Sequence, residues 1–335
     1  MKLSEIGEFG LIKRIKPGCL IRQTGVVKGI GDDCCVFRRS DKMLTVFTTD
    51  MLVENIHFLR HVISPYLLGR KSLAVNLSDI AAMGAIPREF VVSIAIPETV
   101  NVEYLDSVYD GMKSMAREFD VNLLGGDTSS SPQHLVINIA LLGEAAEGEV
   151  LYRSGAMAGD IIFLTGPVGS SAAGLDILLS KRVFDGREEL VNAHYDPHPH
   201  IIAGRIIAGS KMAHSLIDVS DGVASDLGHI CHESQLGAII EKENIPVTDL
   251  FRKYCEQFKL DFEHFALHVG EDYVLLGTVP EKSAQNLKKA LNSGNCEFYS
   301  IGRMVPEKGI KIKNSDGSLR KVKRAGYNSL KGKNQ

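Results

Sequence analysis

Short apolar runs in this sequence repeatedly end on acidic residues. Such runs have the length and composition of buried β-strands, and strand ends place side chains at the rim of a sheet, where ligands bind. If these rims converge, six or more carboxylates share one cleft, and that much negative charge requires multivalent cations. The pattern therefore predicts a site that gathers cations in order to bind phosphate. The acidic segments are residues 29–33 (GIGDD), 43–50 (MLTVFTTD), 73–84 (LAVNLSDIAAMG), 121–127 (VNLLGGD), 215–221 (SLIDVSD) and 265–272 (FALHVGED).

Length and charge narrow the class of protein. A chain of 335 residues favours about two domains, and its net charge of -3 argues against a nucleic-acid partner or a polybasic membrane anchor. No apolar run approaches the length of a membrane span, and the N-terminus lacks the apolar core of a signal peptide. The six cysteines show no CxxC spacing, so they read as reduced thiols. We expect a cytoplasmic protein with no membrane association.

Hydrophobic periodicity predicts a mixture of helices and strands in two parts. Helices are expected at 5–16, 64–83, 102–119, 170–179 and 197–210. Strands are expected at 43–49, 90–96, 121–124, 135–143, 161–165, 216–219, 238–241, 267–269 with 273–279, and 297–302. The segment 143–160 is rich in Gly, Ala and Glu and is typical of a domain junction. We therefore predict a two-domain α+β or α/β fold with domains at 1–149 and 150–335.

Three of the acidic segments combine glycine or hydroxyl residues with an acid. In 29–33 and in GGDT (125–128), the glycines allow the backbone to approach a ligand while an acid binds a metal. In TTD (48–50), hydroxyls and a carboxylate are hard oxygen ligands that suit Mg²⁺ better than Zn²⁺. Tight turns remain the alternative for 29–33 and for TTD, because Gly, Asp and Thr are common turn residues. His57, which follows in VENIHF, is either functional or a structural histidine.

The other acidic segments also have structural alternatives. Asn76 and Asp79 are three residues apart and share a face if the segment is helical, but Ser78 or Asp79 is otherwise the N-cap of a short helix. DVSDG (218–222) places two acids at a strand-to-helix turn, which a capped helix start also explains. In VGEDY (269–273), two acids lie between two predicted strands, as in a hairpin turn.

Several other chemistries are excluded by their missing signatures. The glycine-rich turn TGPVGSSAAG (165–174) lacks the GK[ST] ending of a Walker A loop, and no Gly-x-Ser-x-Gly nucleophile elbow is present. Prolines separate His194, His198 and His200. We therefore interpret this segment as a loop before a helix rather than as a metal site.

Seven motifs occur in order along the chain: GIGDD, TTDMLVENIHF, VNLSDIAAMGAIP, GGDT, RSGAMAGD, DVSDG and GEDY. Together they resemble the thiamine-monophosphate kinases, within the superfamily that includes aminoimidazole ribonucleotide synthetase and selenophosphate synthetase. The resemblance implies an N-terminal mixed-sheet domain that pairs across a homodimer, and a C-terminal α/β sandwich domain. It also implies ATP-dependent phosphorylation of thiamine monophosphate to thiamine diphosphate with several Mg²⁺ ions.

Site residues follow from the match to the family's motifs. The implied metal ligands are Asp33, Thr48, Thr49, Asp50, Asp79, Asp127, Asp218 and Asp221. The implied ATP contacts are Tyr109, Gly126, Asp127, Arg153 and Ser220. The implied contacts to the thiamine phosphate are His57, Glu271 and Tyr327. Asp32 and Asp272 receive no role.

Three positions depart from the family's pattern. Val269 stands where the first Gly of a GGED motif is usual, Asn55 stands where Gly is frequent, and Tyr327 replaces a frequent Trp. These departures bear on substrate affinity.

The mechanism that we expect is direct transfer between two phosphates. Catalysis of phosphoryl transfer is mainly positioning and charge stabilisation, and a terminal phosphate oxygen is already largely ionised at neutral pH. No general base is therefore expected. The alternatives are another ATP-dependent enzyme of the superfamily, such as a ribonucleotide cyclo-ligase or a selenophosphate-type synthetase, and a non-catalytic Mg²⁺- or nucleotide-binding module.

Overall fold

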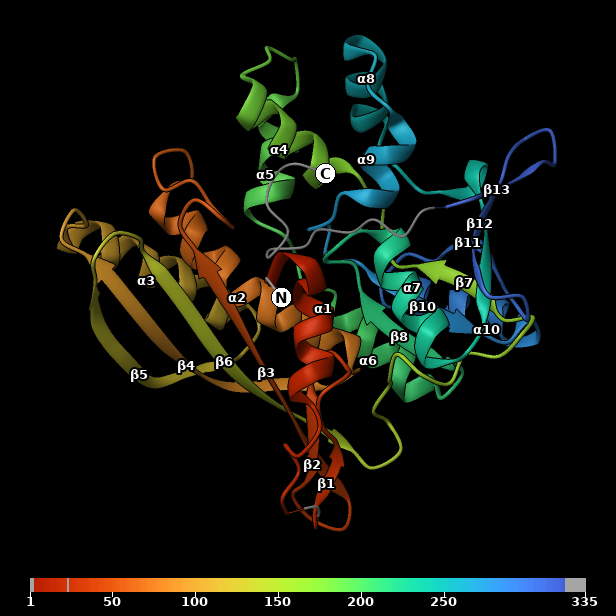
Figure 1. Ribbon diagram of the computed structural model, residues 1–335, viewed down its shortest axis with the longest axis horizontal. Coiled ribbons are helices and arrows are strands. Elements are labelled where there is room, and N and C mark those ends of the chain that lie inside the picture. The colour runs from red at the N-terminus through yellow and green to blue at the C-terminus, as the bar shows by residue number, and fades with distance from the viewer. Residues whose placement is uncertain (1–2, 23, 323–335) are drawn as a thin grey trace.

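Two β-sheets with flanking helices make up the computed structural model, which describes residues 3–22 and 24–322 (Figure 1). The first sheet and its helices come from the N-terminal half of the chain, and the second sheet comes from the C-terminal half. The fold is therefore a two-domain α+β architecture. Residues 147–160 join the two sheets. Within the described ranges, no helix is both long and apolar enough to cross a membrane.

The N-terminal sheet has the strand order β1-β2-β3-β6-β4-β5. All neighbouring strands are antiparallel except β4 and β5, which are parallel. Side chains alternate between a buried face, covered by two helices, and an outer face (Figure 1). The elements are α1 (Leu3–Ile15), β1 (Val26–Lys28), β2 (Cys35–Arg38), β3 (Met43–Val53), α2 (Pro65–Ala82), β4 (Ile86–Pro97), α3 (Val102–Glu118), β5 (Asn122–Ser131) and β6 (Val136–Ala146).

The C-terminal sheet has the strand order β13-β12-β9-β11-β7-β10-β8, in which only β12 and β9 run parallel. Its strands are β7 (Ile161–Leu164), β8 (Ser215–Asp218), β9 (Gly237–Glu241), β10 (Leu275–Val279), β11 (Tyr299–Val305), β12 (Gly309–Lys313) and β13 (Leu319–Lys321). The helices of this half are α4 (Ser170–Ser180), α5 (Arg187–Tyr195), α6 (Ile201–Ser210), α7 (Val223–Glu233), the 3-10 helix η1 (Lys242–Asn244), α8 (Asp249–Phe258), α9 (Phe262–His268) and α10 (Glu281–Ser293).

Helix α2 lies between the two sheets and is buried along most of its length (Figure 1). It begins after the N-cap Ser64, whose side chain accepts a hydrogen bond from the amide of Leu67. Glycine allows its close contact with α3, because a Cβ on Gly69 would lie 1.8 Å from the carbonyl oxygen of Val108. On the other side, a Cβ on Gly204 of α6 would lie 2.3 Å from the carbonyl oxygen of Ala81. The helix is thus fixed in position by both halves of the chain.

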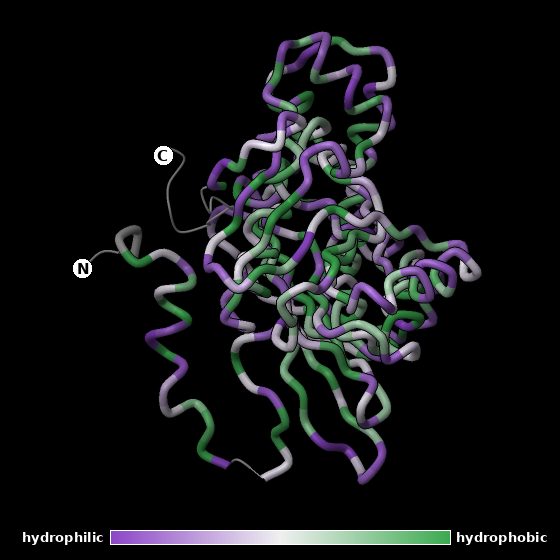
Figure 2. The backbone as a smooth tube through the Cα atoms, turned by 90° about the vertical axis from the view of Figure 1, so that its right-hand side faces the viewer, coloured by the Kyte–Doolittle hydropathy of each residue, from purple (hydrophilic) through white to green (hydrophobic). Residues whose placement is uncertain are grey.

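Figure 2 shows that helix α1 lies at one side of the molecule. The hydrophobic segments gather in the interior of the molecule. One contact that ties α1 to the C-terminal half joins the rings of Phe9 and His229, whose centroids are 4.8 Å apart. The N-terminal helix therefore bridges toward α7.

Most long periodic segments fold as predicted, and short apolar runs account for the errors. The helices expected at 64–83 and 102–119 are confirmed by α2 and α3. The strand expected at 267–269 is wrong, because these residues end helix α9, which Asp261 caps through the amides of Glu263 and His264. VGEDY is therefore not a hairpin turn. Three helices, α5, α8 and α10, and four strands, β1, β2, β12 and β13, were not predicted.

Two acids also lie elsewhere along their strands than predicted. Strand β3 continues through Asp50 to Val53, and β5 continues through Asp127 to Ser131, so neither acid ends a strand. The N-cap alternative for Ser78 or Asp79 is wrong, because α2 begins about four turns earlier. Asp218 does end its strand, β8, as predicted.

Candidate functional site

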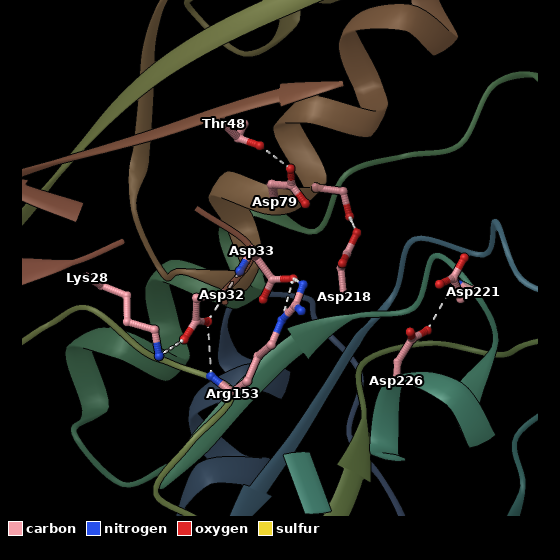
Figure 3. A network of polar contacts seen from close by, with 10 residues as sticks. Lys28, Asp32, Asp33, Thr48, Asp79, Arg153, Asp218, Asp221 and Asp226 are labelled. Atoms are coloured by element: carbon pink, nitrogen blue, oxygen red, sulfur yellow. Dashed lines mark hydrogen bonds and ion pairs between the residues drawn. The ribbon is translucent and has the colours of Figure 1, made fainter. Parts of the chain in front are cut away.

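Three carboxylates from distant parts of the chain meet between the two sheets. Asp33 lies in the loop before β2, Asp79 lies in α2, and Asp218 ends β8. One carboxylate oxygen from each lies within 4.8 Å of those of the other two (Figure 3). Asp33 is 8% exposed and Asp218 is 3% exposed. Carboxylates at this separation repel one another, so the cluster requires compensating charge.

Each carboxylate of this cluster has one protein hydrogen-bond donor in the polar network of Figure 3. The Thr48 hydroxyl donates to Asp79, and the Ser78 hydroxyl donates to Asp218 at 2.6 Å. The Arg153 guanidinium donates to Oδ1 of Asp33 at 2.5 Å. One guanidinium among the donors cannot balance three carboxylates, and Oδ2 of Asp33 is buried with no hydrogen-bond partner.

Burial makes these acids hold protons more tightly than acids in water. Burial, together with repulsion from nearby acids, raises the pKa of Asp33 to about 7 and the pKa values of Asp50 and Asp218 to about 6. Burial also raises the pKa of Asp79 well above its usual range, with Asp50 as the next largest cause. A site that takes up protons so readily also favours cations, and its oxygen donors are those that Mg²⁺ prefers. These residues therefore fit a magnesium site.

Two further acids border the cluster, and one of them was not singled out from the sequence. Asp226, in the first turn of α7, is 2% exposed, and its Oδ2 accepts a hydrogen bond from the amide of Asp221 at 3.2 Å. Burial raises the pKa of Asp221 to about 6 and that of Asp226 well above its usual range. An acid four residues after Gly222, at the start of a helix, is the sequence signal that marks Asp226.

Asp32 supports the cluster without joining it. Its Oδ1 accepts a hydrogen bond from the amide of Arg153 at 3.1 Å, and its Oδ2 lies 2.9 Å from Nζ of Lys28 (Figure 3). This acid therefore positions the backbone of the arginine that contacts Asp33.

Asp127 and Thr49 lie on the other face of the N-terminal sheet from the cluster. Asp50 pairs with Ile139 of β6, which pairs with Val92 of β4, and these two apolar residues are each 1% exposed. Val92 pairs with Gly126, so Asp127, one residue further along β5, points to the outer face. Thr49 points outward for the same reason, because it precedes Asp50 in β3. A single chain therefore does not bring all eight expected metal ligands together.

A second group of polar side chains surrounds Glu271, in the loop between α9 and β10. Nζ of Lys71 lies 3.0 Å from Glu271 Oε1, and Nδ1 of His194 lies 3.4 Å from Oε2. Burial lowers the pKa of His57, and its Nδ1 accepts a hydrogen bond from the amide of Val53 at 3.0 Å. The neutral ring therefore carries its proton on Nε2, where it is free to donate to a ligand.

The comparisons with known proteins agree with each other. Residues 31–145 match the family model described as AIR synthase related protein, N-terminal domain, and residues 157–314 match the model of the C-terminal domain. The thiamine-monophosphate kinase of Bacillus subtilis (strain 168) is 35% identical over 329 residues, which cover 97% of this chain and 99% of that protein. The thiamine-monophosphate kinase of Escherichia coli (strain K12) is 38% identical over 304 residues, which cover 90% and 91%. The chain belongs to the thiamine-monophosphate kinase family.

A solved structure leads to the same family. The structure described as "AaThiL complexed with AMPPCP and TMP" aligns with a TM-score of 0.86 and 32% identity, covering 98% of both chains. The two-domain fold expected from the resemblance to thiamine-monophosphate kinases is thereby confirmed.

The remaining residues implied by the thiamine-monophosphate kinase motifs are not among the three clustered carboxylates, and one of them lies outside the described residues. Tyr109 lies in α3 and packs against the hydrophobic core. Ser220 follows β8, and its carbonyl oxygen accepts a hydrogen bond from the amide of Glu271 at 2.8 Å. Tyr327 lies outside the described residues. The roles of these residues toward ATP and substrate stay predictions.

Asp272, which had no role in the sequence, caps a helix. Its carboxylate accepts hydrogen bonds from the amides of Gly169 at 3.0 Å and Ser171 at 3.4 Å, at the N-terminus of α4. Burial raises the pKa of Asp272 to about 7, although the hydrogen bond from Gly169 acts to lower it. Two neighbouring acids thus differ in function, since Glu271 points toward Lys71 and Asp272 points toward the helix.

Proposed function

We propose that this protein transfers the γ-phosphoryl group of ATP to the phosphate of thiamine monophosphate, giving thiamine diphosphate and ADP. The observation that carries the proposal is the cluster of Asp33, Asp79 and Asp218, whose charge is suited to cation-assisted phosphate chemistry. Membership of the thiamine-monophosphate kinase family indicates which substrates the protein would use. The related solved structure is described as a complex with AMPPCP, which is an analogue of ATP.

The chain's own residues would hold the charge and the geometry of this reaction. Asp33, Asp50, Asp79 and Asp218 would bind several Mg²⁺ ions, which when bound would offset the repulsion between the phosphates. Thr48 and Ser78 would keep two of the carboxylates oriented. Asp221 is close enough to Asp218 to raise the pKa of that carboxyl, and it would extend the cation site.

The transfer needs no general base. An oxygen of the acceptor phosphate forms a new bond to the γ-phosphorus in line with the departing group, while the bond from the γ-phosphorus to the bridging oxygen breaks and ADP leaves. The attacking oxygen is mostly ionised, because the second pKa of a phosphate monoester is about 6. Arg153, which donates to Asp33, would contact ATP.

The test is an assay of the purified protein with ATP, Mg²⁺ and thiamine monophosphate. We expect thiamine diphosphate and ADP in equal amounts, and no product when Mg²⁺ is chelated. Asp33→Asn should lower kcat/KM by at least about a hundredfold, since it removes a carboxylate from the metal site. Glu281→Gln is a matched control, because this acid is exposed and pairs with Arg303 on the surface. Absence of both products from the wild-type protein would refute the proposal.

We also infer that the protein acts as a homodimer in which Asp127 serves the partner's site. Asp127 lies on the outer face of the sheet, in the edge strand β5. That face is apolar and uncovered in the single chain: Met51 is 53% exposed, Val91 is 40% exposed and Leu124, on the same edge strand, is 67% exposed. Exposed apolar surface of this kind marks a protein interface.

Mixing two inactive variants tests the shared site. If each site takes Asp33 from one chain and Asp127 from the other, a heterodimer of Asp33→Asn and Asp127→Asn keeps one intact site. Random exchange of subunits should then restore about a quarter of wild-type activity. Co-purification of differently tagged chains would show that heterodimers form, and heterodimers without any recovered activity would contradict the shared site.

We place this activity in the cytoplasm. All six cysteines, at positions 19, 34, 35, 231, 255 and 296, are free thiols, which suits a reducing compartment. Detection of the protein in a cell fraction separated from the cytoplasm would contradict this location.

A further inference from the structure

Lys71 is a charged side chain buried in the middle of the molecule. It lies in α2, between the two sheets, and is 1% exposed. A lysine is almost never fully buried without a strong reason, because removing an ammonium from water costs several kcal/mol. Its Nζ lies 3.0 Å from Oε1 of Glu271, but makes no well-directed hydrogen bond within the described residues. The ammonium group of Lys71 therefore has Glu271 as its ion-pair partner.

The backbone around Glu271 is held in a strained conformation. Glu271 has a φ of 66°, in the left-handed region that a residue with a side chain rarely adopts. The preceding residue, Gly270, approaches the β8–α7 turn so closely that a Cβ there would lie 2.0 Å from the carbonyl oxygen of Ser220. The amide of Glu271 donates to that same carbonyl oxygen at 2.8 Å. Strain of this kind persists where surrounding contacts fix the backbone, and it clusters at functional sites.

The charges around Glu271 favour an ionised carboxylate. Burial acts to raise the pKa of Glu271, but Lys71 is the largest opposing influence, and the net pKa lies below its ordinary value. Burial lowers the pKa of His194 to about 4, so this ring is neutral at pH 7 and its Nδ1 is shared between Glu271 and the hydroxyl of Ser171. Lys71 therefore supplies the positive charge, and His194 supplies a polar neighbour on the other oxygen.

We propose that Lys71 is a positioning residue, which acts with His194 to hold the Glu271 carboxylate ionised and aimed at the organic part of the acceptor substrate. A carboxylate only accepts hydrogen bonds and repels phosphate, so Glu271 suits the cationic ring or the amino group of thiamine rather than its phosphate. The inference rests on the proposed function, because that function makes Glu271 a substrate contact. It adds two residues, from α2 and α5, to the acceptor side of the site.

Steady-state kinetics of three single variants and one double variant test this role. Lys71→Met should raise KM for thiamine monophosphate at least about tenfold, the range for a lost contact to a charged group, while KM for ATP changes less than about twofold. Lys71→Arg keeps the charge and should recover most of the affinity. Glu271→Gln should raise KM for thiamine monophosphate by itself. In that background Lys71→Met should add nothing further, because Lys71 acts through Glu271.

The outcomes separate this inference from the proposed function. A wild-type protein without thiamine diphosphate production refutes the function itself. With wild-type turnover, an unchanged KM in Lys71→Met, or an equal loss in the presence and absence of Glu271, overturns the role of Lys71. If Lys71→Met does not fold, His194→Gln takes its place. We expect His194→Gln to raise KM for thiamine monophosphate, and we expect no such increase in the Glu271→Gln background. Equal increases in both backgrounds would overturn the proposal that His194 acts through Glu271.

Discussion

Binding of Mg²⁺ to the carboxylate cluster should release protons near pH 6. The pKa of Asp33 is raised to about 7 and those of Asp50 and Asp218 to about 6. At pH 6, Asp33 is therefore mostly protonated and the other two are half protonated, and Asp79, whose pKa is also raised, adds to this count, so at least about two protons must leave when metal binds. The values for Asp33, Asp50 and Asp218 alone predict that Mg²⁺ affinity rises at least on the order of 40-fold between pH 6 and pH 8.

The metal-free protein should show the complementary effect on stability. An acid whose pKa is raised by folding stabilises the protein below its ordinary pKa, and this contribution is lost as pH rises through the raised value. For Asp33 the window runs from about pH 4 to about pH 7, and its contribution is about 4 kcal/mol. Thermal unfolding should therefore occur at lower temperature at pH 7.5 than at pH 5.5 without Mg²⁺, and added Mg²⁺ should stabilise most at the higher pH.

Calorimetric titration with Mg²⁺ in buffers of different ionisation enthalpy counts the protons directly. Asp33→Asn should release about one proton fewer than the wild-type protein at pH 6, and its Mg²⁺ affinity should rise about tenfold less than that of the wild type between pH 6 and pH 8. Asp272→Asn is a matched control, because Asp272 is buried with a pKa raised to about 7 but caps α4. If wild-type binding releases no protons at pH 6, the cluster is not the metal site.

Three further substitutions probe the geometry. Gly270→Ala places a Cβ 2.0 Å from the carbonyl oxygen of Ser220, so it should shift the Glu271 carboxylate. KM for thiamine monophosphate should rise, while Mg²⁺ affinity should stay within about twofold. An unchanged KM contradicts this prediction. Gly69→Ala forces α2 away from a backbone carbonyl of α3. It should therefore weaken the binding of both Mg²⁺ and thiamine monophosphate and lower the melting temperature. Weaker binding of only one of the two ligands contradicts this prediction. Ser78→Ala removes the hydrogen-bond donor to Asp218. At pH 8, where this carboxylate is ionised, the free energy of unfolding measured in urea should fall by about 1–3 kcal/mol. An unchanged free energy of unfolding contradicts this prediction.

The sequence predicts elements well where periodicity is long, and poorly where a side chain's partner comes from another part of the chain. Helix α2 follows from its pattern over 64–83, whereas the run before Glu271 is too short to distinguish a strand from the end of α9. The acidic motifs predict that carboxylates gather, and Asp33, Asp79 and Asp218 do so.

The alternation within strands, however, separates neighbouring candidates. Asp50 and Thr49 are adjacent in β3, yet they point to opposite faces of the sheet, which no motif match distinguishes. Lys71 was missed because one lysine beside an apolar run reads as a surface residue. Only the packing of α2 between two domains shows that it is buried and facing Glu271.

Helix α2 is the element that relates the two parts of the site. It carries Asp79 of the carboxylate cluster, Ser78 donates from it across the domain boundary to Asp218, and Lys71, about two turns before Asp79, contacts Glu271. Because both domains pack tightly on this helix, the separation between Asp79 and Lys71, the partner of Glu271, is set by a rigid element. In the proposed reaction, which would depend mainly on positioning two phosphates, that fixed separation would itself contribute to catalysis. The buried charges of α2 would therefore serve the proposed mechanism, although burying them is costly for the stability of the chain.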